Sequence, residues 1–145
     1  MSDVAVPTST RANRADAGML ADSPLARMFA AAACAVISYI HVKDQGGIGA
    51  LKDPAYLGQG YRLLEVAALV AAALLLVQPR VWAWLLSAGV AAGPLVGFTL
   101  TRSVGLPSAR DDIGNWTEPL GLWAIGTEFV LLVVSLVALA RRASR

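Results

Sequence analysis

Five ionisable side chains lie inside or at the ends of long apolar stretches, where a charge needs a chemical or structural reason. They are His41, Arg62, Glu65, Arg102 and Glu128. At the rise of an α-helix, His41 lies about 20 Å from Arg27, and Glu65 and Glu128 lie equally far from Gln78 and Arg141. A carboxylate in hydrocarbon costs about 2.5–3.5 kcal/mol, so buried charges usually face a partner inside a bundle. We therefore expect a polar layer at one depth.

This layer has three interpretations. Arg62 or Arg102 can pair with Glu65 or Glu128 and fix the register of the helices. The layer can instead form a path for a proton or small ligand, because an imidazole and a desolvated carboxylate can exchange protons near neutral pH. His41, Glu65 and Glu128 can also hold a divalent metal, although no HxxH or ExxH pair completes that ligand set. Haem is disfavoured because the chain has one histidine, and the cofactor stays unknown.

The elements that must position these residues are four apolar stretches. The chain is 57% hydrophobic and 15% charged, which is typical of an integral membrane protein. The stretches predict helices at about 27–42, 60–78, 81–102 and 117–140. Their short connections favour an all-α, up-down four-helix bundle in residues 27–145. Residues 1–26 have no sustained periodicity and no signal-peptide core, so we expect a disordered cytoplasmic tail.

The basic residues predict the orientation of this bundle. Seven arginines fall on one side: Arg11, Arg14, Arg27, Arg80, Arg141, Arg142 and Arg145. Five basic residues fall on the other: Lys43, Lys52, Arg62, Arg102 and Arg110. The positive-inside rule then places both termini in the cytoplasm of a multi-pass protein of the cell membrane. The basic residues flank apolar stretches and form no nucleic-acid-binding patch.

The third apolar stretch carries Gly89, Gly93 and Gly97 at four-residue spacing. Such a ridge predicts close helix packing within the bundle, or a homodimer seam. Pro94 lies in the same stretch and should bend it, because proline removes a backbone donor and crowds the preceding turn.

The polar segment before the fourth stretch is the second candidate site. It contains Asp111, Asp112, Asn115, Trp116 and Glu118. Asn115 or Thr117 is expected to cap the fourth helix, with Glu118 placed as in a capping box. The alternative is that Asp111, Asp112 and Glu118 form an acidic mouth that attracts a cation or a basic patch of a partner.

Two runs in this segment resemble a known family. R-S-V-G-L-P begins at Arg102, and D-D-I-G-N-W-T-E-P-L-G ends at Gly121. With Ile40-His41 and the run Y-L-G-Q-G-Y-R-L-L-E (56–65), they resemble a family of small four-helix membrane proteins common in high-GC Gram-positive bacteria. The resemblance covers about residues 28–140. It implies the fold and the choice of site, and it implies no reaction, substrate or cofactor.

From these patterns we expect a non-enzymatic accessory or assembly subunit, docking a membrane-protein partner or a second copy through the loop and the glycine ridge. The alternative is binding or translocation of a proton, a metal ion or a quinone-like ligand through the polar layer. An enzyme is the third choice, since no nucleophile with an adjacent base is visible in the sequence.

Overall fold

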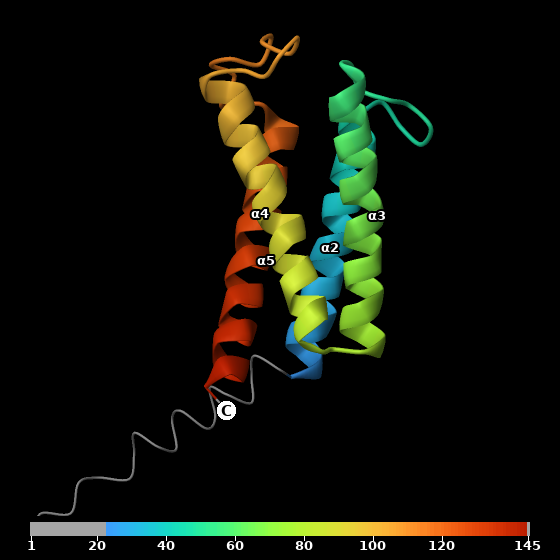
Figure 1. Ribbon diagram of the computed structural model, residues 1–145, viewed down its shortest axis with the longest axis vertical. Helices are drawn as coiled ribbons and strands as arrows, with labels where there is room; N and C mark the ends of the chain where they lie inside the picture. Colours follow the sequence, from blue (N-terminus) through green and yellow to red (C-terminus); the bar gives the residue numbers. More distant parts are fainter. Residues whose placement is uncertain (1–22, 145) are drawn as a thin grey trace, which may run out of the picture.

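The computed structural model describes residues 23–144, and this part of the chain forms four antiparallel helices (Figure 1). They are α2 (Pro24–Asp44), α3 (Ala55–Val77), α4 (Val81–Ser103) and α5 (Pro119–Ala143). Loops 45–54 and 104–118 lie at one end, called here the loop end. The turn 78–80, the start of α2 and the end of α5 lie at the other, the terminal end. The all-α prediction is confirmed, and the expected disorder of residues 1–22 lies outside the described residues.

Each of these helices is long and apolar enough to cross a membrane. Most of the large apolar side chains point outward, with Leu63, Val77 and Trp123 each about three-quarters exposed. The interior is instead built largely of small residues such as Ala30, Cys34, Ala68, Ala71 and Ala91. An apolar exterior around a small-residue interior is the arrangement expected of helices that face lipid.

Helix α2 begins earlier than the sequence predicted. Ser23 is its N-cap, and its hydroxyl accepts a hydrogen bond from the amide of Ala26 at 3.2 Å. Pro24 follows in the first turn, where its missing N–H costs nothing. Residues 24–26 therefore belong to the helix and not to the expected tail.

Helix α5 begins later than predicted, at Pro119 instead of residue 117. The N-cap is Glu118, and its side chain makes no capping hydrogen bond. The expected caps at Asn115 and Thr117 are therefore wrong. The carboxylate of Glu118 accepts a hydrogen bond from Arg102, so a tertiary contact has replaced the local one.

Two hairpins, α2–α3 and α4–α5, make up the bundle, and arginine side chains bind backbone carbonyls at the terminal end. Arg27 on α2 donates to the carbonyls of Leu75 and Leu76 at 3.1 and 3.3 Å, where α3 ends. Arg142 on α5 donates to the carbonyl of Pro79 at 2.6 Å. Towards the loop end the two hairpins diverge (Figure 1). Pro94 lies inside α4.

The glycine ridge of α4 does not pack closely within the bundle. A methyl group built on Gly89, Gly93 or Gly97 would meet no atom within 4 Å. The prediction of tight intrachain packing at these glycines is therefore wrong, because Gly93 and Gly97 line a cavity instead of contacting a neighbouring helix. A homodimer seam on it stays a prediction.

Candidate ligand cavity

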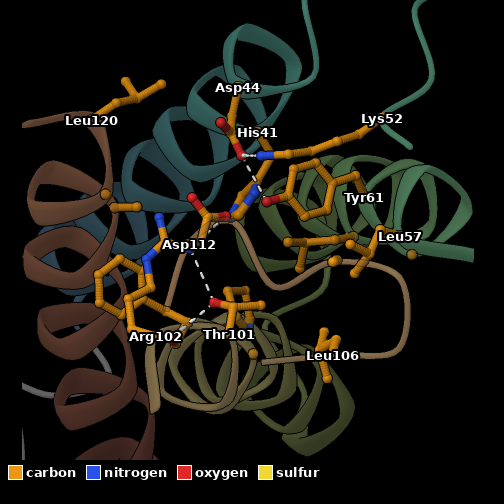
Figure 2. A pocket seen from close by; sticks show the side chains of 18 of the residues that line it. His41, Asp44, Lys52, Leu57, Tyr61, Thr101, Arg102, Leu106, Asp112 and Leu120 are labelled. Atoms are coloured by element: carbon orange, nitrogen blue, oxygen red, sulfur yellow. Dashed lines mark hydrogen bonds and ion pairs between the residues drawn. The ribbon is translucent and has the colours of Figure 1, made fainter. Parts of the chain in front are cut away.

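A cavity of about 500 Å³ lies between the two hairpins at the loop end. All four described helices and both loops contribute to its wall. Figure 2 shows that His41, Asp44 and Tyr61 face Thr101, Arg102 and Asp112 across this space. Three clusters of polar side chains therefore share one cavity.

The deepest cluster is a buried pair. Nε2 of His41 lies 3.1 Å from Oε1 of Glu128, and the two side chains are 9% and 1% exposed. His41 is in the last turn of α2, and Glu128 faces it from the middle of α5. One helical turn towards the terminal end, Ile37 and Leu131 are fully buried and do not line the cavity, so the cavity ends near the pair on this side. The structure thus brings together two of the three residues of the predicted layer.

The hydrogen bonding of His41 is incomplete. With neutral histidine, Nε2–H donates to the carboxylate, and Nδ1 keeps a lone pair. Nδ1 is buried and has no hydrogen-bond partner in the described part of the chain. The ring of Tyr61 packs edge-on against the imidazole, with centroids 5.0 Å apart. In this tautomer, Nδ1 can therefore accept one further hydrogen bond.

The second cluster centres on Asp44, at the end of α2. Its Oδ2 accepts hydrogen bonds from Nζ of Lys52 at 2.8 Å and from the hydroxyl of Tyr61 at 2.6 Å. Lys52 reaches it because loop 45–54 folds back onto α3 at Gly58. A Cβ there would lie 2.7 Å from the Lys52 carbonyl oxygen.

Sequence reasoning missed all three members of this cluster. Asp44 and Lys52 lie in a stretch that resembles an ordinary polar connection, and Tyr61 resembles the aromatic residues common at the ends of membrane helices. The only sequence feature that could have indicated this cluster was Gly58, which allows the close contact with the Lys52 backbone. A helical glycine shows its purpose only when the neighbouring backbone is known.

The third cluster surrounds Arg102, whose side chain is 9% exposed. Nη2 donates to Glu118 at 2.6 Å, Nη1 to Asp112 at 3.2 Å, and Nε to the carbonyl of Asn115 at 3.2 Å. The guanidinium also lies over the ring of Phe98, 4.3 Å from its centroid. Arg102 therefore ties the second loop to the end of α4, as a planar fork with several donors can.

The predicted loop residues divide around this arginine. Asp112, Asn115 and Glu118 contact it, and Trp116 packs edge-on against Phe98 with centroids 6.1 Å apart. Asp111 is exposed and lines the cavity. The three carboxylates of the predicted acidic mouth thus all line the cavity, but two of them form ion pairs with Arg102.

Arg62 and Glu65 lie away from the cavity. Arg62 donates to the carbonyl of Ala50 at 3.3 Å, and Glu65 accepts from Nε2 of Gln45 at 2.5 Å. The expected pairing of Arg62 or Arg102 with Glu65 or Glu128 is therefore wrong. With Glu65 elsewhere, the three-ligand metal layer is not formed. No group of three or more His, Cys, Asp or Glu side chains in residues 23–144 is arranged to hold a metal ion.

The mouth of the cavity is bridged by one further contact. The hydroxyl of Tyr56, at the start of α3, donates to the carbonyl of Pro107 in the second loop at 2.6 Å. Leu106, Ser108 and Ala109 of that loop line the cavity next to this bond. Together with the buried His41–Glu128 pair, this exposed hydrogen bond links the two hairpins around the cavity.

Comparison of the chain with models of protein families, with curated proteins and with solved structures gives no significant match. The resemblance noted in the sequence stays a prediction.

Proposed function

We propose that this is a multi-pass protein of the cell membrane that binds a small ligand in the cavity at its loop end. The observation that carries the proposal is the buried His41–Glu128 pair at the floor of a 500 Å³ cavity. Ligand sites commonly have about this volume and combine apolar walls with a few polar groups. A buried ionisable pair in a membrane bundle is by default a functional candidate.

Binding is favoured over translocation by the floor of the cavity. Ile37 and Leu131 are fully buried directly beneath the pair, and Leu75 and Trp84 are fully buried nearer the terminal end. The ligand would therefore enter and leave on the side of the loops. In this respect the proposal differs from the path through the bundle that the sequence also allowed.

Ligand binding is also favoured over the accessory-subunit hypothesis. Asp112 and Glu118, expected on a docking surface, are turned onto Arg102. Their charges stabilise the loop and are less available to a partner. Docking of a membrane-protein partner or a second copy through the exposed glycine ridge stays a separate prediction.

The proposed orientation places the loop end outside the cell and both termini in the cytoplasm. Arg27, Arg80, Arg141 and Arg142 lie at the terminal end next to the helix ends. The positive-inside rule supports this side as cytoplasmic. The cavity would then open towards the outside.

The test uses two glycines of α4 that both have free space. Gly97 lines the cavity and Gly89 does not. Gly97→Leu should fill the cavity without a clash, and Gly89→Leu adds the same side chain to the same helix elsewhere. The full chain in phosphatidylcholine nanodiscs would be titrated by calorimetry with phenylbutanol, phenylbutylammonium and phenylbutanoate.

We expect saturable binding of at least one of these compounds to the natural chain and to Gly89→Leu. Gly97→Leu should weaken that binding by about tenfold or more, because the added side chain occupies the cavity. If no compound distinguishes the two leucine variants, the cavity is not a ligand site.

A further inference from the structure

The charge of the cavity wall is strongly unbalanced. Its acidic residues are Asp44, Asp53, Asp111, Asp112, Glu118 and Glu128. Against these six stand only Lys52 and Arg102, with His41 as the one group that can add a charge. Glu65 is the sole acidic residue of the described chain outside this wall. Nearly all the negative charge of residues 23–144 is thus gathered around one cavity.

From this wall we infer that the ligand is a small organic cation, an ammonium group attached to an apolar body. The inference rests on the proposed ligand site and specifies its chemistry. A cavity with low-dielectric walls and charge of one sign concentrates ions of the opposite sign. The following contacts favour a cation over the neutral and anionic alternatives.

The cationic donors of the wall are already engaged by carboxylates. Arg102 donates to Asp112 and Glu118, and Lys52 donates to Asp44. The hydroxyl of Tyr61 also donates to Asp44. An anion, or a quinone-like ligand that needs donors for its carbonyls, would have to displace these bonds.

Hydrogen-bond acceptors, in contrast, are in excess of donors in the cavity wall. Asp53 and Asp111 line the cavity and have no ion pair among the described residues. An independent sign comes from His41, which points into the cavity and is more than nine-tenths buried. Its Nδ1 has no partner within residues 23–144, and in the neutral form with Nε2–H on Glu128 it is an acceptor. A ligand that brings N–H donors and positive charge complements all of these groups.

The rest of the wall fits an apolar body. Ile40, Leu64, Pro94, Phe98 and Ala124 line the cavity between the polar clusters. The rings of Phe98 and Tyr61 already lie beside the protein's own cations, Arg102 and Lys52. Aromatic faces attract ammonium and guanidinium groups and are common in sites that recognise ammonium ligands.

The experiment compares the head groups of the three phenylbutyl compounds on the full chain in phosphatidylcholine nanodiscs at near-neutral pH. Phenylbutylammonium should bind about tenfold more tightly than phenylbutanol, and phenylbutanoate should bind most weakly. The preference should shrink at about 1 M salt, because salt screens the partly exposed carboxylates.

The variant that tests the origin of this preference is Asp53→Asn/Asp111→Asn. Both side chains are exposed and have no ion pair in the described chain, so the fold should tolerate the change. We expect the preference for the ammonium over the alcohol to fall at least about threefold. The control Glu65→Gln removes a carboxylate outside the cavity and should change the preference by less than about twofold.

The outcomes separate this inference from the proposed function. The alcohol or the carboxylate could bind as tightly as the ammonium, with Gly97→Leu blocking that binding. This result would contradict the inference of a cationic ligand and still support the ligand site. An ammonium preference that the double variant does not reduce would also overturn the inference. If no compound binds in a way that Gly97→Leu blocks, both the ligand site and the cation inference are wrong.

Discussion

The His41–Glu128 pair illustrates how a buried charge depends on its partner. Glu128 is 1% exposed and has no arginine or lysine beside it in the described chain, only the imidazole at 3.1 Å. Desolvating such a pair costs free energy that its mutual attraction only partly returns. Stability alone therefore gives little reason to keep these two residues, which is consistent with the proposed ligand site.

This view predicts a non-additive pair of substitutions. Glu128→Leu leaves His41 buried without a partner and should destabilise the protein by about 3 kcal/mol. Adding His41→Leu removes the unpaired group and should restore most of that loss, because an apolar pair of similar size needs no desolvation. Thermal unfolding midpoints in mild detergent measure both effects. A double variant less stable than Glu128→Leu would contradict this account.

At the residue scale, the sequence predicted some of this site. Depth along a helix follows from residue spacing, so His41 and Glu128 could be placed in one layer. The direction of a side chain depends on the rotation of its helix about its own axis. A helix that is apolar on all sides gives no sequence pattern that predicts this rotation. Glu65 therefore had the right depth and the wrong face, and it binds Gln45 instead.

At the element scale, the loops are held by tertiary contacts that local sequence patterns, such as helix-capping motifs, do not predict. Asn115 and Glu118 match a capping pattern, yet the Asn115 carbonyl and the Glu118 carboxylate both accept from Arg102. The existence of four helices was predictable from their apolar length. Their ends at 24 and 119, and the return of loop 45–54 onto α3, depended on specific contacts of Ser23, Arg102 and Gly58.

Two glycines near the start of α3 provide a matched prediction. A Cβ at Gly58 would lie 2.7 and 2.9 Å from backbone atoms of Lys52, whereas one at Gly60 would meet nothing within 4 Å. Gly58→Ala should destabilise the protein by about 1–3 kcal/mol, because the backbone must move. Gly60→Ala should leave stability unchanged or raise it by up to about 1 kcal/mol through helix propensity. Equal unfolding midpoints for the two variants in mild detergent would show that loop 45–54 does not pack on α3.

At the scale of the whole molecule, both the apolar surface and the distribution of arginines bear on how the bundle is placed in a membrane. The exposed apolar side chains belong to all four described helices. The loop end carries the cavity and its acidic residues, and the terminal end carries arginines at the helix ends. The proposed function and the proposed topology are therefore linked, because the side that the loops face would be the side that supplies the proposed ligand.

The orientation can be tested by labelling single cysteines in intact cells. The natural Cys34 is fully buried and would be replaced by alanine. Ile48→Cys, at a residue 97% exposed in the first loop, should react with a membrane-impermeant maleimide. Ser144→Cys, at the terminal end, should react only after the cells are opened. The reverse pattern would place the cavity on the cytoplasmic side.

The closed floor of the cavity has an electrical consequence. From Pro119 to Glu128, α5 rises about 14 Å, somewhat less than half of a hydrocarbon core of about 30 Å. Moving one charge across the whole core changes its free energy by about 2.3 kcal/mol per 100 mV. A monovalent cation entering from outside would reach the floor after crossing less than half of that field. An interior-negative potential of 100 mV would therefore raise its affinity by about fivefold. Occupancy of this dead-end site would then follow the membrane voltage, although no charge crosses the membrane.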